Sequence, residues 1–294
     1  MNPTGILLVD KPGGGTSHDV VARARRALGT RKVGHAGTLD PMATGLLILG
    51  VGSATRLLTY LVGLGKRYTT TIRLGVATDT DDAEGSVIAA ADASDLERAR
   101  IDEQVAALTG ELAQIPSSFS AVKVEGRRAY DRARAGEEVV LAPRTVTISR
   151  FEVLAERRDA QVVDLDAVVE CSSGTYIRAL ARDLGAALGV GGHLTALRRE
   201  AIGPFEVADA TPLAALDPAA LIPASTIARR LFPVAELDAR QSVDLGHGKR
   251  VRLEVPDAPV VAAIAPGDVL TGLVAVRAGE ARVLVNFPSG EVLS

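Results

Sequence analysis

Two neighbouring segments with different hydrophobic periods constrain the fold of this chain most. Residues 161–171 (QVVDLDAVVEC) alternate apolar and polar positions, which predicts a half-buried β-strand. Residues 175–188 place apolar side chains every three or four positions, which predicts an amphipathic helix. Short apolar strands are predicted at residues 5–9 and 46–51 as well. Strands and helices are thus interspersed, an order that favours an α+β or mixed α/β fold.

Capping patterns predict two further helices. Ser17 can cap a helix whose apolar positions follow the 3.6-residue period and which Gly29 ends. A capping-box pattern at residues 94–97 predicts the start of another helix, which ends near Gly110.

The length and the composition of the second half predict two domains. A chain of 294 residues suggests one large domain and a smaller one. Residues 203–234 are rich in Ala and Pro and are interpreted as a connecting region. After them, residues 251–255, 269–277 and 281–287 have the pattern of strands, which predicts a small β-rich domain.

The expected compartment is the cytoplasm. The single cysteine, Cys171, cannot form an internal disulfide, which favours a reducing environment. The N-terminal segment does not fit a signal peptide, and no run approaches the roughly 18 apolar residues of a membrane span. We therefore expect no membrane partner, and the lack of a long heptad pattern favours a monomer.

The net charge of −3 conceals a basic N-terminal region. Residues 1–73 contain ten Lys and Arg against three acids, a net of +7, and residues 123–134 add a second basic cluster. Clustered basic charge is typical of a surface that contacts a phosphate backbone, although ordinary solvated faces also carry such clusters.

Several familiar kinds of site are absent from the sequence. The Gly-rich segment 10–17 (DKPGGGTS) lacks the Gly-Lys-Ser/Thr ending of a P-loop and is interpreted as a structural turn. The acidic segment 79–85 fails the ligand order of an EF-hand and is interpreted as a turn with room for a polar role at a substrate cleft. The four histidines and one cysteine show no zinc-type spacing. We expect neither a metal nor another cofactor.

Residues 34–45 (GHAGTLDPMATG) are the most informative segment. By itself, Asp40-Pro41 favours a structural turn. The longer stretch GTLDPMATGLLILGVGSATR, however, resembles the signature of the bacterial tRNA pseudouridine synthase B family, which modifies a uridine in the TΨC loop (position 55) of tRNA. Other segments agree in order: residues 5–17, 66–80, 171–178 and 193–199 resemble further motifs of the family, and residues at about 114–145 resemble its RNA-gripping insertion.

The resemblance implies a fold, an activity and a set of site residues. The fold is α+β, with a mixed, largely antiparallel sheet and flanking helices in a catalytic domain at residues 1–230, and a small PUA-like β-rich domain at residues 231–294. Asp40 is implied as the catalytic carboxylate and Arg178 as the guanidinium that keeps it ionised. Tyr68, Tyr176 and Leu197 are implied as walls of the base pocket. His35 is implied to fill the space that a flipped-out uridine leaves.

The implied partner is tRNA, through the TΨC stem-loop and in some members also the acceptor end. Basic side chains on two segments would hold its phosphates without reading sequence: Arg23, Arg26, Arg31, Lys32, Lys123, Arg127 and Arg128. Two alternatives stay open at this point. One is a non-catalytic RNA-binding module that uses the same basic surface, and the other is a nucleotide-triphosphate-dependent enzyme that uses the Gly-rich segment.

Overall fold

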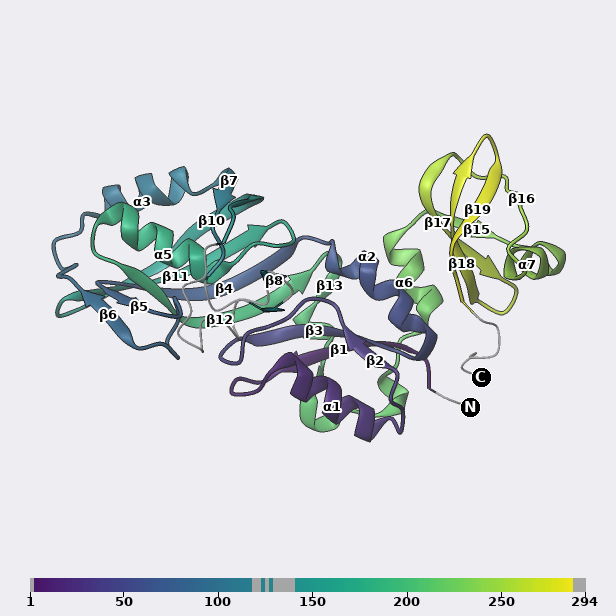
Figure 1. Cartoon of the computed structure of the whole chain (residues 1–294), viewed down its shortest axis with the longest axis horizontal. Helices are drawn as coiled ribbons and strands as arrows, with labels where there is room; N and C mark the ends of the chain where they lie inside the picture. Colours follow the sequence, from purple (N-terminus) through teal and green to yellow (C-terminus); the bar gives the residue numbers. More distant parts are fainter. Residues whose placement is uncertain (1–2, 118–122, 125–126, 129–140, 288–294) are drawn as a thin grey trace. The chain divides into compact units, whose positions relative to one another are not determined.

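The computed structural model describes residues 3–117, 123–124, 127–128 and 141–287. It divides into two compact units (Figure 1). The first unit combines Met1–Pro41, Gly45–Val62 and Pro204–Ser294, and the second combines Met42–Thr44 with Gly63–Gly203.

Four sheet strands make up the N-terminal part of the first unit. They are β1 (Gly5–Lys11), β2 (Val33–His35), β3 (Thr44–Val51) and β14 (Thr211–Pro212). β3 pairs antiparallel with both β1 and β2, and β14 pairs parallel with β1. The apolar side chains of β1 and β3 are almost fully buried, as their continuous hydrophobic runs predict.

Helix α1 (Ser17–Ala27) follows β1, and its cap differs from the prediction. Thr16 is the N-cap residue: its hydroxyl accepts from the Asp19 N–H, and Asp19 in return accepts from the Thr16 N–H. The predicted cap, Ser17, is the first helical residue instead, because its hydroxyl is engaged elsewhere. The 3₁₀-helix η1 (Gly52–Leu57) and helix α2 (Leu58–Val62) follow β3.

The C-terminal part of the first unit contains a second, five-stranded sheet in the order β15-β17-β18-β19-β16. In chain order, the elements of this part are β13 (Phe205–Glu206), η2 (Val207–Asp209), η3 (Leu213–Ala215), η4 (Pro218–Ala220), α6 (Ala224–Leu231), β15 (Val234–Glu236), α7 (Ala239–Gly246), β16 (Val251–Arg252), β17 (Ala258–Ala265), β18 (Val269–Arg277) and β19 (Glu280–Asn286). Val261, Val274 and Val276 pack with Leu245 of α7 in a core of their own. The predicted β-rich C-terminal part is confirmed, whereas a domain boundary at residue 231 stays a prediction. The predicted connecting region instead holds the short elements β13 to α6.

The second unit is an antiparallel sheet with helices packed on it. The strand order is β12-β4-β11-β10-β7, and every pairing among these strands is antiparallel. The elements are β4 (Lys66–Leu74), β5 (Val76–Thr78), β6 (Val87–Ala90), α3 (Arg98–Ala107), β7 (Gly110–Gln114), β8 (Lys123–Val124), β9 (Arg127–Arg128), β10 (Arg144–Asp159), β11 (Val162–Cys171), α5 (Ile177–Leu188) and β12 (Gly192–Ile202). Helix α5 packs against β12 and β4.

The strand predicted at residues 161–171 is confirmed as β11, with every second side chain buried. Helix α3, by contrast, begins at Arg98 and not at the predicted cap, Ser94. The Ser94 N–H donates to the Asp92 carboxylate at 2.8 Å, so this segment forms a turn before the helix. Most of the predicted insertion at about 114–145 lies outside the described residues.

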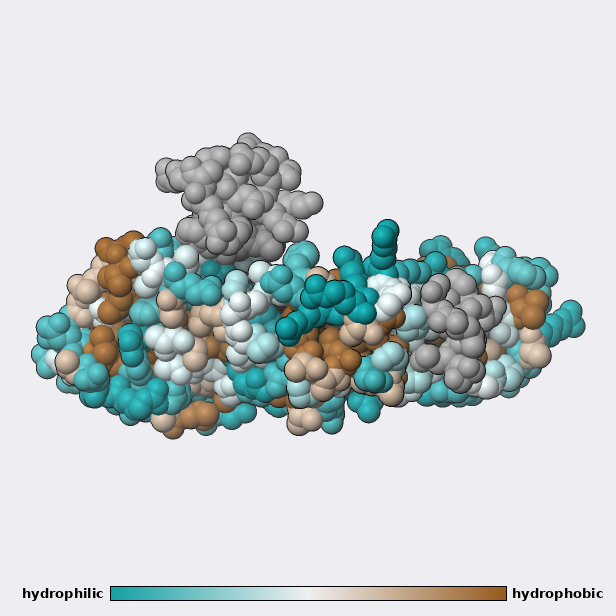
Figure 2. Space-filling view, turned by 90° about the horizontal axis from the view of Figure 1, so that it is seen from below, coloured by the Kyte–Doolittle hydropathy of each residue, from teal (hydrophilic) through white to brown (hydrophobic). Residues whose placement is uncertain are grey.

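The α+β fold with largely antiparallel sheets is therefore confirmed. Within the described ranges, no helix is both long and apolar enough to cross a membrane. The face drawn in Figure 2 is a mosaic of hydrophilic and hydrophobic residues. Because more than half of a folded protein's accessible surface is apolar, such a mosaic alone marks no docking site.

Candidate active site

Asp40 lies half-buried in the loop between β2 and β3, and both of its neighbours are anchored through their main chains. Ser17 Oγ accepts a hydrogen bond from Leu39 N at 2.9 Å and lies 3.1 Å from Leu39 O. On the other side, the carbonyl of Pro41 accepts from Lys11 Nζ at 3.1 Å and from Gly14 N at 2.9 Å. Lys11 and Ser17 are each only 1% exposed, so these bonds are shielded from water.

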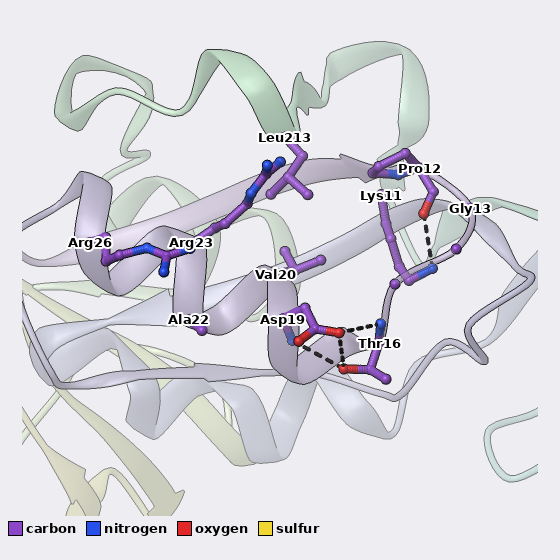
Figure 3. A pocket seen from close by; sticks show the side chains of 12 residues that line it. Lys11, Pro12, Gly13, Thr16, Asp19, Val20, Ala22, Arg23, Arg26 and Leu213 are labelled. Atoms are coloured by element: carbon purple, nitrogen blue, oxygen red, sulfur yellow. Dashed lines mark hydrogen bonds between the residues drawn. The ribbon is translucent and has the colours of Figure 1, made fainter.

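Lys11 and Gly14 of the Gly-rich segment thus hold the Asp40 loop through the Pro41 carbonyl. A cavity of about 430 Å³ lies beside this segment, lined by Lys11 to Thr16 and by Arg23 and Arg26 of α1 (Figure 3). Lys11 Nζ turns back onto the carbonyl of Pro12 at 3.0 Å. The start of the helix faces the Asp19 carboxylate, whose pKa the hydrogen bonds from Thr16 hold below its usual range. A carboxylate where a phosphate would sit argues against the triphosphate hypothesis.

His35, the last residue of β2, packs edge-to-face against His18 of α1, with ring centroids 5.6 Å apart. The structure therefore brings His35 and the anchored Asp40 loop together within the first unit. The antiparallel pairing of β2 with β3 places His35 opposite Leu49, and the loop that joins these two strands carries Asp40.

In the second unit, Tyr68 and Leu197 share one face of the sheet. Tyr68 of β4 lies opposite Arg199 of β12, and Thr70 lies opposite Leu197. Directly opposed residues of antiparallel strands project to the same face, and so do residues two apart on one strand. Both side chains are buried, and α5, which carries Arg178 in its first turn after Tyr176, packs against these two strands.

Arg178 is held by acceptors from the acidic segment at residues 79–85. Its Nη1 donates to the Thr80 carbonyl at 2.8 Å and lies 3.3 Å from Asp82 Oδ2; both side chains are only 4% exposed. Asp82 itself accepts from Thr80 Oγ1 and from Glu84 N. Next to it, burial raises the pKa of Asp81, which the charge of Arg182 partly offsets. The acidic turn therefore holds the Arg178 side chain, and a polar role at a substrate cleft stays a prediction.

The predicted partnership between Asp40 and Arg178 joins residues of different units and stays a prediction. Asp82 was missed as the acid beside Arg178, because an acidic turn has no local signal that identifies its partner.

Two cations, the buried Arg199 and the half-buried Lys66, accompany Tyr68 on the sheet. Arg199 is almost fully buried opposite it, and Lys66 lies two residues before it on β4. Burial, with a contribution from the Arg199 charge, lowers the pKa of Lys66 to about 8, and its Nζ donates to the Leu64 carbonyl. Burial also raises the pKa of Cys171, opposite Lys66 on β11, to about 11. Alternation along β4 could have placed Lys66 on the Tyr68 face.

The basic residues predicted to contact RNA lie in both units. Arg23 and Arg26 are exposed on α1, and Arg31 and Lys32 are exposed in the loop before β2. Lys123, Arg127 and Arg128 belong to the short paired strands β8 and β9. Across the described ranges, no group of three or more His, Cys, Asp or Glu is arranged to hold a metal ion.

Comparison with family models identifies the class of protein. Residues 25–177 match the TruB family pseudouridylate synthase N-terminal domain. Residues 178–237 match the tRNA pseudouridylate synthase B C-terminal domain, and residues 232–288 match the tRNA pseudouridine synthase II C-terminal domain. The chain belongs to the TruB family of pseudouridylate synthases. It is therefore an enzyme that isomerises uridine to pseudouridine.

Individual relatives narrow the class to proteins named for tRNA. A tRNA pseudouridine synthase B of Leifsonia xyli subsp. xyli is 60% identical over 98% of both chains. One of an Arthrobacter species is 54% identical over 98% of both chains. Among solved structures, a Cbf5-Nop10-Gar1 complex matches with a TM-score of 0.72 and 26% identity, over 96% of this chain and 84% of the other. An H/ACA RNP bound to a substrate RNA, at 24% identity and a TM-score of 0.71, shares the fold.

Proposed function

We propose that this protein converts the uridine at position 55 in the TΨC loop of tRNA to pseudouridine, with Asp40 as the catalytic carboxylate. The observation that carries the proposal is the anchoring of Leu39 and Pro41, which fixes the main chain on both sides of Asp40. A reacting group must be held close to its productive geometry, and buried hydrogen bonds to its neighbours achieve this.

The reaction is an isomerisation, so its atoms balance without a co-reactant. The bond between ribose C1′ and base N1 breaks, the base turns within the pocket, and C1′ joins C5. The C5 proton is lost and N1 gains one. Asp40 engages the uridine as nucleophile or as a charge that stabilises the developing positive charge on the ribose. Tyr68 lies against the base and helps to move the C5 proton.

The remaining site residues bind and isolate the uridine. Arg178 keeps the Asp40 carboxylate ionised in a pocket that excludes water. Tyr176 and Leu197 form walls for the base. The uridine must be flipped out of its stack, which costs a few kcal/mol, and His35 fills the space that it leaves.

Basic side chains hold the tRNA backbone. Arg23 and Arg26, which line the cavity beside the Gly-rich segment, contact phosphates together with Arg31 and Lys32. Lys123, Arg127 and Arg128 add contacts from the predicted insertion. The C-terminal domain, at residues 231–294 and of PUA-like type, contacts the acceptor end. The protein acts as a cytoplasmic monomer.

The test is incubation with an unmodified tRNA transcript, followed by mapping of pseudouridine at single-nucleotide resolution. We expect pseudouridine at position 55 and none in a transcript that carries cytidine there. Tight binding without any pseudouridine would favour the non-catalytic RNA-binding alternative. Modification at another position would contradict the assigned substrate site and leave the chemistry standing.

A further inference from the structure

Gln114, the last residue of β7, makes two hydrogen bonds to the main chain of a single residue on a different element. Its Nε2 donates to the carbonyl of Tyr176 at 3.1 Å, and its Oε1 accepts from the Tyr176 N–H at 2.9 Å. Gln114 is 4% exposed, and its own main chain is held in the ladder opposite Arg144. A strand of the sheet therefore holds both polar groups of the Tyr176 main chain.

Helix α5 has no side-chain cap of its own at the residue that Gln114 grips. Tyr176 is the N-cap residue, and its side chain accepts no hydrogen bond from the first turn. Its carbonyl accepts the first helical bond, from Leu180 N, in addition to the bond from Gln114. Gln114 Oε1 therefore supplies from another element the bond to the N-cap N–H that an N3 side chain supplies in a capping box, and Gln114 Nε2 also holds the N-cap carbonyl.

The residues that follow Gln114 continue along the same helix. The Ile115 carbonyl accepts from Arg182 Nη2 at 2.8 Å. Ser117, fully buried, donates to the Thr80 carbonyl at 3.3 Å and lies 3.5 Å from Arg178 Nη1. Arg178 and Arg182 are one turn apart, so the segment lies along one side of α5 and over its first turn.

We propose that Gln114 is a positioning residue that sets where α5 begins, and thereby places Tyr176 and Arg178 for the isomerisation. This inference rests on the proposed function, which assigns those two residues to the site. The segment at residues 114–117 also leads into the predicted RNA-contacting insertion, so the main chain entering the insertion and the start of α5 are fixed to each other.

The chemistry of the side chain explains why glutamine stands here. A neutral amide carries one acceptor and a donor in a single plane, which matches the N–H and C=O of one residue. A carboxylate can accept from the Tyr176 N–H, but it presents a second acceptor to the Tyr176 carbonyl. A protonated carboxyl group again has both a donor and an acceptor.

The experiment compares Gln114→Ala and Gln114→Glu with the wild-type protein on unmodified tRNA. Single-turnover rates at saturating enzyme report the chemical step, and a separate titration reports the tRNA Kd. We expect Gln114→Ala to slow the single-turnover rate at least about tenfold and to change the Kd by less than about twofold, because a small misplacement of site residues slows the chemistry. The matched control is Gln104→Ala, the same substitution at a half-buried glutamine of α3, and it should keep the wild-type rate.

Gln114→Glu supplies a pH-dependent readout, measured where circular dichroism shows that the variant stays folded across the pH range. Its rate relative to wild type should rise as the pH falls from about 8 to about 5.5, because burial favours the neutral carboxyl group that restores both hydrogen bonds. If Gln114→Ala fails to fold, the pH dependence of the isosteric Gln114→Glu variant tests the positioning role instead. A relative rate that stays the same over this pH range, or wild-type rates in both variants, would overturn the inference. Asp40→Asn is measured alongside: if it is active, the catalytic role proposed for Asp40 fails, whereas an inactive Asp40→Asn with fast Gln114 variants refutes only the role of Gln114.

Discussion

The loop that carries Asp40 and the helix that carries Arg178 are held in different ways. In the first unit, Ser17, Lys11 and Gly14 act on the main chains of the two residues beside Asp40. In the second unit, the acceptors act on the Arg178 guanidinium itself, and one of them is the buried carboxylate of Asp82.

This difference predicts how much stability is lost when a partner of the Asp40 loop or of Arg178 is removed. Loss of one anchor beside Asp40 removes a hydrogen bond and leaves a buried polar group without it, which costs about 1–3 kcal/mol. Loss of the acid beside Arg178 removes a buried carboxylate that lies 3.3 Å from the buried guanidinium, which costs about 3–5 kcal/mol. The guanidinium therefore depends on its surroundings more strongly than the Asp40 loop does.

The largest effect is expected for Asp82→Asn. The substitution keeps the shape and an acceptor for Thr80 and Glu84, but it removes the charge beside Arg178. We expect the free energy of unfolding to fall by about 3 kcal/mol in urea denaturation. Asp102→Asn, which breaks an exposed pair with Arg98, is the control and should cost no more than about 0.5 kcal/mol. Equal losses of unfolding free energy in the two variants would show that the buried Arg178 does not depend on the Asp82 charge.

A smaller effect is expected for Ser17→Ala. It deprives Leu39 N of its buried acceptor and should lower the free energy of unfolding by about 1–2 kcal/mol. The rate of pseudouridine formation should also fall, since Leu39 fixes the main chain before Asp40. Exposed Ser86→Ala serves as the control, measured by the same denaturation and rate assays. If Ser17→Ala keeps both the wild-type stability and the wild-type rate, the hydrogen bond between Ser17 and Leu39 does not contribute to catalysis.

The smallest effect is expected at the ion pair of Arg73 and Asp164. Arg73 donates two hydrogen bonds of 2.8 Å to the carboxylate, and these hold the pKa of Asp164 below its usual range. A group with a lowered folded pKa contributes stability above its unfolded pKa of 3.8, and this contribution is lost as the pH falls through the folded value. Because Arg73 is 38% exposed, Asp164→Asn should cost less than about 1 kcal/mol at pH 7. A loss as large as that of Asp82→Asn would show that exposure does not separate the two pairs.

The sequence predicts elements well where the hydrophobic period is regular. β11 keeps strict alternation and was predicted almost to its ends, as was α5 from its apolar stripe. β10 was missed because register shifts near Ile148 and Val153 break its alternation. At Ser17 the prediction failed for another reason: the hydroxyl bonds Leu39, 22 residues away, and a local pattern cannot reveal such a partner.

The same distinction applies to the site. Asp40, Tyr68 and Arg178 stand within motifs that resemble a known family, so the sequence alone could nominate them. Gln114 lies in such a motif too, but its partner, Tyr176, is 62 residues away, and its role follows only from the packing of β7 beside the start of α5. Long-range hydrogen bonds of this kind carry no period and no local spacing.

The most direct measurement is the single-turnover rate of pseudouridine formation by Asp40→Asn on an unmodified tRNA transcript, together with its tRNA affinity. The substitution removes the negative charge and keeps the size of the side chain. We predict no detectable pseudouridine and a Kd within about threefold of wild type, because phosphate contacts supply most of the affinity. An Asp40→Asn variant that still forms pseudouridine at the wild-type rate would contradict the assignment of this carboxylate.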